Sequence, residues 1–232
     1  MSAVELIATI GLGLLPSLTW MVFYLQEDNK HPEPLGMVFY AFVVGGLMTF
    51  LALVLQIVFR GALGSALGAN HPFELFLFAV VEELIKFGAV YWFISSRKEF
   101  DEPLDAMIYM VVVGLGFAAV ENIASLGQTT TSLITGINQI AKLEILALRF
   151  FGATLLHSLT GAIVGSHWGK AIEKWREVSK GIFTGLFIAI LLHVIFNYLI
   201  LITGPIAWVI SFLVFVGFFV ISDFEDLRAH DA

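Results

Sequence analysis

Three ionisable residues interrupt an apolar stretch of the sequence, FAVVEELIK at residues 78–86. Glu82, Glu83 and Lys86 stand where the flanking residues have the composition of a membrane-spanning helix. An ionisable side chain at the centre of such a helix costs about 2.5–3.5 kcal/mol and usually faces the protein interior at a functional site. Lys86 follows Glu82 by four residues, so we expect these two to form an ion pair that leaves Glu83 pointing about 100° away.

Further ionisable residues lie in three other apolar stretches, where they are Glu121, His157 and His193. Asn197 follows His193 by four residues, so both side chains can reach one reacting atom. At 1.5 Å per residue, Glu82 and these three ionisable residues lie roughly 8–20 Å below the outer surface of the bilayer. The sequence therefore predicts a buried polar centre shared by four helices.

A buried carboxylate beside imidazole and amide groups suits the hydrolysis of a carbonyl group by water. Glu82 or Glu83 can act as the general base for that water, and His193 with Asn197 can donate hydrogen bonds to the developing oxyanion. The same residue types form catalytic zinc (Zn²⁺) sites, in which three protein ligands leave one position open. Because HExxH is absent, such a site would assemble from separate helices, and its candidate ligands are Glu82, Glu121, His157 and His193.

Each residue also has a structural explanation. Lys86 can serve only as the counter-ion of a buried carboxylate, and a single histidine can be an interhelical hydrogen-bonding contact. Arg149 can reach the membrane surface or pair with Glu144. Several polar groups at one depth nevertheless favour chemistry, because apolar residues would pack the same bundle without a desolvation cost.

The rest of the sequence has the composition of a polytopic membrane protein. Of its 232 residues 59% are hydrophobic and 13% charged, and the mean hydropathy is +0.91. We expect an all-α transmembrane bundle in a single domain, residues 1–232, with a motif-bearing core at about 31–203 and a cytoplasmic tail at 223–232. Apolar stretches of about 20 residues predict seven membrane helices at 3–25, 35–59, 73–95, 105–126, 144–166, 182–203 and 205–222.

Basic residues predict the orientation of these helices. One side of the predicted bundle carries Lys30, Arg97, Lys98, Lys170, Lys174, Arg176, Lys180 and Arg228. The other side carries Arg60 and Lys142. The positive-inside rule then places the N-terminus outside and the C-terminus in the cytoplasm. The net charge of −7 and the scattered basic residues exclude a nucleic-acid-binding patch, and the absence of cysteine excludes thiolate chemistry.

Small residues indicate where helices approach closely. Gly114 and Ala118 form a small-xxx-small pair, and Gly161 and Gly165 share one stripe with His157. We therefore expect a compact bundle with the polar groups at its centre.

Several motifs together resemble one family of membrane enzymes. EELIK at 82–86 fits EExxK, FAAVEN at 117–122 fits FxxxEN, and HVIFN at 193–197 fits HxxxN. HPEP in the first loop and RFFGATLLHSLTGAIVG at 149–165 extend the similarity. Over about residues 31–197 the chain resembles the PrsW family of intramembrane proteases, which is similar to the CAAX prenyl proteases and bacteriocin-immunity proteins.

The resemblance implies roles for individual residues. Glu82 and Glu83 correspond to the catalytic glutamate pair, with Lys86 as ionic partner. Glu121, followed by Asn122 in the FxxxEN motif, takes a position where the CAAX proteases have histidine.

The histidine motifs complete these implied roles. His193 and Asn197 match the oxyanion-stabilising pair, and His157 is an additional histidine of the family. The implied activity is that of an intramembrane endopeptidase in a bacterial or archaeal cell membrane, acting on a single-pass membrane protein such as an anti-sigma-type regulator.

Two other functions are compatible with the same residues. A proton-coupled transporter or channel would use the glutamates and histidines as a relay. A non-catalytic protein could bind a membrane peptide at the same polar centre.

Overall fold

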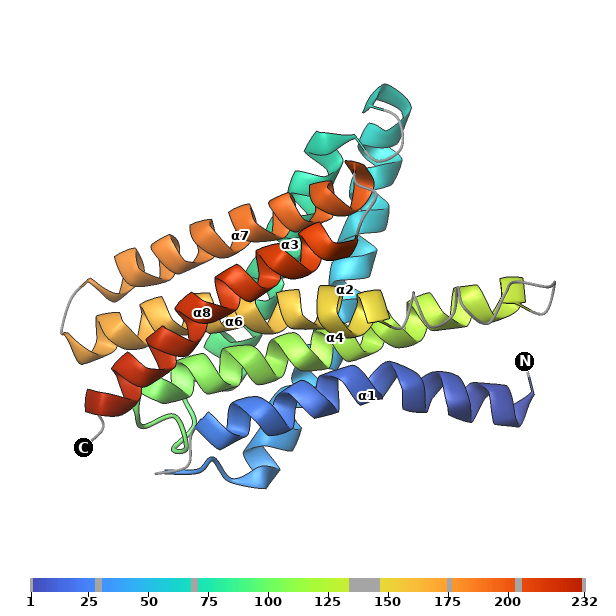
Figure 1. Cartoon of the computed structure of the whole chain (residues 1–232). Coiled ribbons are helices and arrows are strands. Elements are labelled where there is room, and N and C mark those ends of the chain that lie inside the picture. The colour runs from blue at the N-terminus through green and yellow to red at the C-terminus, as the bar shows by residue number, and fades with distance from the viewer. Residues whose placement is uncertain are drawn as a thin grey trace.

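The computed structural model describes residues 2–27, 31–67, 71–133, 147–174, 177–202 and 206–230. These ranges contain α-helices and one π-helical turn but no strand, so the expected all-α bundle is confirmed (Figure 1). The elements are α1 (Ala3–Glu27), α2 (Leu35–Leu67), α3 (Pro72–Phe93), α4 (Pro103–Leu133), the π-helical turn η1 (Arg149–Ala153), α6 (Thr154–Glu173), α7 (Val178–Ile202) and α8 (Ile206–His230).

Helices α4 and α6 form the centre of the bundle. The apolar window of α4 is 89% buried, and α6 is buried on nearly all sides between Thr154 and Ala171. Helices α1 and α2 pack against α4, whereas α7 and α8 pack against α6 (Figure 1). Helix α3 contacts α2 on one side and α7 on the other. This arrangement surrounds the polar residues of α3 and α6 with apolar helices.

The close approach of α4 and α6 depends on glycine. A Cβ atom added to Gly114 would lie 2.6 Å from the carbonyl oxygen of His157, and one added to Gly161 would lie 2.6 Å from that of Met110. A Cβ on Gly165 would also meet the backbone, at Ala106. The predicted small-residue stripe is therefore the contact surface of the two central helices, and it fixes the height of His157 relative to α4.

We expect Gly161→Ala to destabilise the protein, because its methyl group would meet the backbone of Met110 rather than a flexible side chain. Overpacking of this kind costs about 1–3 kcal/mol. Thermal unfolding in detergent measures the effect. Gly217→Ala on α8 is the matched control, since a Cβ there has no neighbour within 4 Å and alanine favours the helix. Equal unfolding temperatures for the two variants would contradict this packing argument.

Among the described residues, five of seven α-helices are long and apolar enough to cross a membrane, namely α1, α2, α4, α7 and α8. Helix α3 is long enough but carries too many charged residues for such a helix, namely Glu74, Glu82, Glu83 and Lys86. Helix α6 is rich in serine, threonine, glycine and histidine. The charged residues of α3 and the polar residues of α6 thus lie inside the bundle, where neighbouring helices surround them.

Several helix boundaries differ from those predicted. Helix α2 extends to Leu67 and α4 to Leu133, well beyond the predicted ends of their apolar stretches. The span predicted at 144–166 is shifted, since α6 continues to Glu173, while residues 144–146 lie outside the described ranges. Most of the expected tail at 223–232 is helical, since α8 continues to His230. Lys170 Nζ of α6 pairs with Asp223 Oδ1 in this part of α8 at 2.6 Å.

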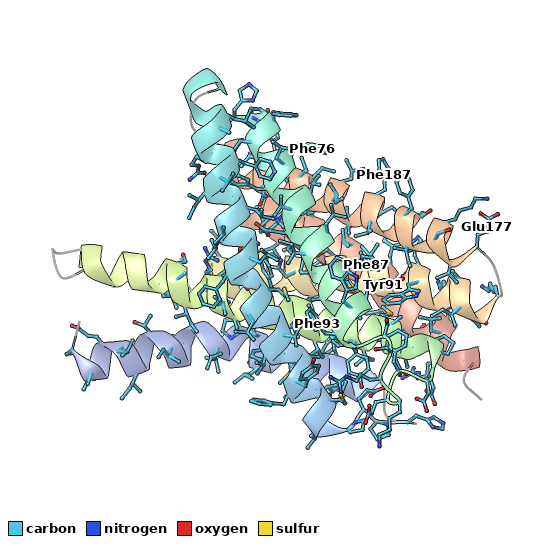
Figure 2. All side chains as sticks on the ribbon, turned by 180° about the vertical axis from the view of Figure 1, so that it is seen from behind. Phe76, Phe87, Tyr91, Phe93, Glu177 and Phe187 are labelled. Atoms are coloured by element: carbon cyan, nitrogen blue, oxygen red, sulfur yellow. The ribbon has the colours of Figure 1, made fainter. Side chains whose placement is uncertain are left out.

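Helices α2 and α3 form a hairpin that crosses the other helices steeply (Figures 1 and 2). With 33 residues, α2 is about 50 Å long at 1.5 Å per residue, which exceeds the roughly 30 Å hydrocarbon core and requires tilting. In Figure 2, Phe76 lies toward one end of α3 and Phe93 toward the other. Glu82 and Glu83 fall between these aromatic residues, midway along α3.

Candidate active site

Helix α3 contributes two carboxylates and one amine to the interior. Glu82 is 7% exposed, and both Glu83 and Lys86 are fully buried. Lys86 Nζ donates to Glu83 Oε1 at 2.7 Å. The expected Glu82–Lys86 ion pair is therefore wrong, because the i,i+3 spacing to Glu83 is used instead of the i,i+4 spacing. This pairing neutralises Glu83 and leaves Glu82 without a basic partner on its own helix.

His193 of α7 lies between the two glutamates. Its Nδ1 is 2.7 Å from Glu83 Oε1, and its Nε2 is 3.6 Å from Glu82 Oε2. When the imidazole is neutral, its Nδ1–H group donates a hydrogen bond to Glu83. The lone pair at Nε2 then faces the Glu82 carboxylate. Two electron-pair donors that face each other repel unless a proton donor or a cation interacts with both. Water and a metal ion both meet this requirement.

His157 of α6 connects α3 with α4. Its Nδ1 lies 3.1 Å from Lys86 Nζ and accepts a hydrogen bond, since an ammonium group only donates. Its Nε2 consequently carries a proton and donates to Glu121 Oε2 at 3.0 Å. Lys86 also donates to Thr160 Oγ1 at 3.2 Å. The Glu121 side chain is 24% exposed, which makes it the most accessible carboxylate of the site.

Gln56 of α2 belongs to the site although sequence reasoning missed it. Its Nε2 donates to Glu82 Oε1 at 2.6 Å. A single amide in a long apolar helix was the available signal, because hydrocarbon offers it no hydrogen-bond partner. Gln56 carries no charge, however, and the polar residue one turn after it, Arg60, pairs with Glu74 rather than with the site.

The remaining predicted residues lie at or beside this centre. Asn197 is half-buried, one helical turn from His193 on α7. Asn122 points away from Glu121 and joins helices, since its Nδ2 donates to Thr154 Oγ1 at 2.9 Å. Arg149 Nη1 is 3.4 Å from Asn122 Oδ1. The alternative partner of Arg149, Glu144, lies outside the described residues.

The donor set fits a catalytic metal ion. Glu82, His157 and His193 each offer a ligand atom within 4.8 Å of the others, and one carboxylate with two imidazoles is a known catalytic zinc set. His193 is already oriented, because its other nitrogen donates to Glu83 in the manner of ligand histidines. Both ring nitrogens of His157 are engaged, Nδ1 with Lys86 and Nε2 with Glu121, so His157 would have to release one of these contacts to bind a metal.

A glutamate and histidine centre enclosed by membrane-spanning helices suits an intramembrane hydrolase. The family model described as "PrsW family intramembrane metalloprotease" matches residues 33–222, and the chain belongs to that family. It is accordingly a multi-pass membrane endopeptidase. This membership decides against the transporter and the non-catalytic binding protein as the general class.

Curated relatives agree with this assignment. The chain is 29% identical over 193 residues to "Protease PrsW" of Geobacillus kaustophilus, covering 83% of this chain and 79% of the relative. It is 27% identical over 217 residues to "Protease PrsW" of Bacillus subtilis, covering 91% and 92% of the two chains. No solved structure matches the chain.

Proposed function

We propose that the site hydrolyses a peptide bond of a membrane-anchored protein with a water molecule held between Glu82 and His193. The observation that carries this proposal is the 3.6 Å approach of Glu82 Oε2 to His193 Nε2. Glu82 has no basic partner on its own helix, so its carboxylate is available to accept the proton of the water. Glu83 suits this role less well, because it is fully buried and its Oε1 already accepts from Lys86 and His193.

Zinc would be held by Glu82, His157 and His193. When bound, the ion would make water a stronger nucleophile and polarise the scissile carbonyl group. Glu82 is essential with or without the metal, since it holds either the water or the ligand set. Without a metal, Glu121 would orient His157 through their hydrogen bond.

Other residues would bind the substrate at the same centre. Asn197 lies one turn from His193, and its amide would donate to the oxyanion that forms on the scissile carbonyl. The partly exposed Glu121 marks the side from which the substrate backbone would enter. Asn122 would act indirectly, by holding α1, α4 and α6 together through Gly13 and Thr154.

We further propose that the substrate is a single-pass membrane protein, such as an anti-sigma-type regulator, cut in the outer half of the bilayer. Basic residues at one end of the bundle, including Lys170, Lys174 and Lys180, support a cytoplasmic location of that end. The N-terminus of α1 would then be outside, and one domain, residues 1–232, would carry the whole activity.

The test reconstitutes the purified chain in liposomes with a panel of single-pass anti-sigma-type proteins. Mass spectrometry maps the cut, and elemental analysis of the same preparations measures zinc. We expect one zinc per wild-type chain, and we expect His193→Ala to lose both metal and cleavage. His31→Ala is the matched control, because His31 is 57% exposed and pairs with Glu102 outside the site.

Two results would change the proposal in different ways. Active wild-type protein without metal would assign water activation to Glu82 alone. Cleavage only of soluble peptides, with every membrane-anchored protein left intact, would overturn the proposed substrate class.

A further inference from the structure

Gln56 interrupts the apolar run LALVLQIVF at residues 51–59 of α2. One turn before it, Ala52 belongs to a small apolar cluster with Val81 and Phe117, and one turn after it Arg60 pairs with Glu74. An amide inside the bilayer needs a partner within the protein, because lipid tails supply none. The partner is Glu82 Oε1 at 2.6 Å. This contact brings α2 into the site as a fifth contributing helix.

We propose that Gln56 is a positioning residue that orients the Glu82 carboxylate, an inference that rests on the proposed role of Glu82. The terminal torsion of a glutamate side chain has a broad preference, so fixing one oxygen sets the orientation of the carboxylate. Gln56 fixes Oε1, and the rigid geometry of the group then turns Oε2 toward His193, where the atoms are 3.6 Å apart. The reacting oxygen is thereby preorganised before substrate binds.

An amide suits this task better than a basic residue. Lys86 shows what a cation does at the neighbouring position, since it holds Glu83 in a buried ion pair. A neutral amide donates one hydrogen bond without neutralising the carboxylate, so Glu82 keeps its capacity to bind a proton or a cation. The NH₂ end of Gln56 must face Glu82, because an ionised carboxylate only accepts hydrogen bonds.

The experiment compares Gln56→Met with Gln56→Asn in the reconstituted full-length protein. Methionine keeps the length of the side chain without a donor, and asparagine keeps the donor but is one methylene shorter. We expect both variants to lower kcat by about tenfold to hundredfold while KM and the unfolding temperature stay near wild type. Gln26→Met is the matched control, because Gln26 is exposed near the far end of α1.

A second readout separates positioning from packing. In a Glu82→Asp background the shortened side chain no longer reaches Gln56. The double variant Glu82→Asp/Gln56→Met should therefore have a kcat within about threefold of that of Glu82→Asp alone. An additive loss would overturn the inference, and so would wild-type kcat in both single variants. If Gln56→Met does not fold, the kcat of Gln56→Asn alone tests the positioning role of Gln56. If Glu82→Gln is inactive while both Gln56 variants are fully active, only the positioning role of Gln56 is overturned. If Glu82→Gln is active, the proposed function itself is overturned.

Discussion

Glu82→Gln is expected to abolish proteolysis while the protein remains folded. Glutamine has the shape of glutamate and can still bond Gln56, but it cannot accept the proton of the attacking water and is a poor metal ligand. We expect cleavage to fall by at least about 10³-fold, within the range for loss of a group that acts in the transition state. The rate of substrate cleavage in liposomes measures the loss, and unfolding in detergent measures the stability.

The control for Glu82→Gln is the same substitution at Glu225, an exposed glutamate of α8. Glu225→Gln should keep wild-type activity, which excludes a general effect of removing one negative charge. Residual cleavage by Glu82→Gln above one-tenth of the wild-type rate would mean that another carboxylate activates the water.

Lys86→Met is expected to cause the largest loss of stability. The substitution leaves the Glu83 carboxylate fully buried and without its cation. Glu83 Oε2 already has no hydrogen-bond partner among the described residues, so the remaining contact with His193 would have to stabilise the charge alone. Breaking one side of a buried ion pair costs about 3–5 kcal/mol. Unfolding in detergent and the yield of membrane-inserted protein both measure the effect.

The double variant Glu83→Gln/Lys86→Met provides the internal check. It removes both charges, so most of the lost stability should return even though Lys86 no longer bonds His157 and Thr160. Lys174→Met, at an exposed position at the end of α6, should have no effect. A stable Lys86→Met single variant would show that Glu83 is not charged in the folded protein.

The sequence predicted the helical fold and the convergence of four helices because both follow from the high cost of polar groups in lipid. Glu82, Glu121, His157 and His193 do lie together, and the small residues of α4 and α6 do form a close contact. Single amino-acid types and their spacing are sufficient for such conclusions, since few arrangements hide several polar groups at once.

The sequence alone could not predict which side chains pair within the site. Lysine lies within helical reach of both glutamates of EExxK, and the contacts of Lys86 with His157 and Thr160 on α6 accompany its pairing with Glu83. Asn122 adjoins Glu121 in sequence but projects about 100° around the helix, where it meets Thr154 instead. Adjacency in a motif therefore did not imply a shared role.

The charged residues of α3 and the many polar residues of α6 have a consequence for how the protein enters the membrane. Neither helix meets the composition expected of an independently inserting segment, whereas α4 and α7 do. Polar segments of this kind stay in the bilayer only when neighbours cover them. Integration into the membrane and completion of the active centre thus become one event during biogenesis, and a chain that cannot assemble the site also exposes the residues that mark it as misfolded.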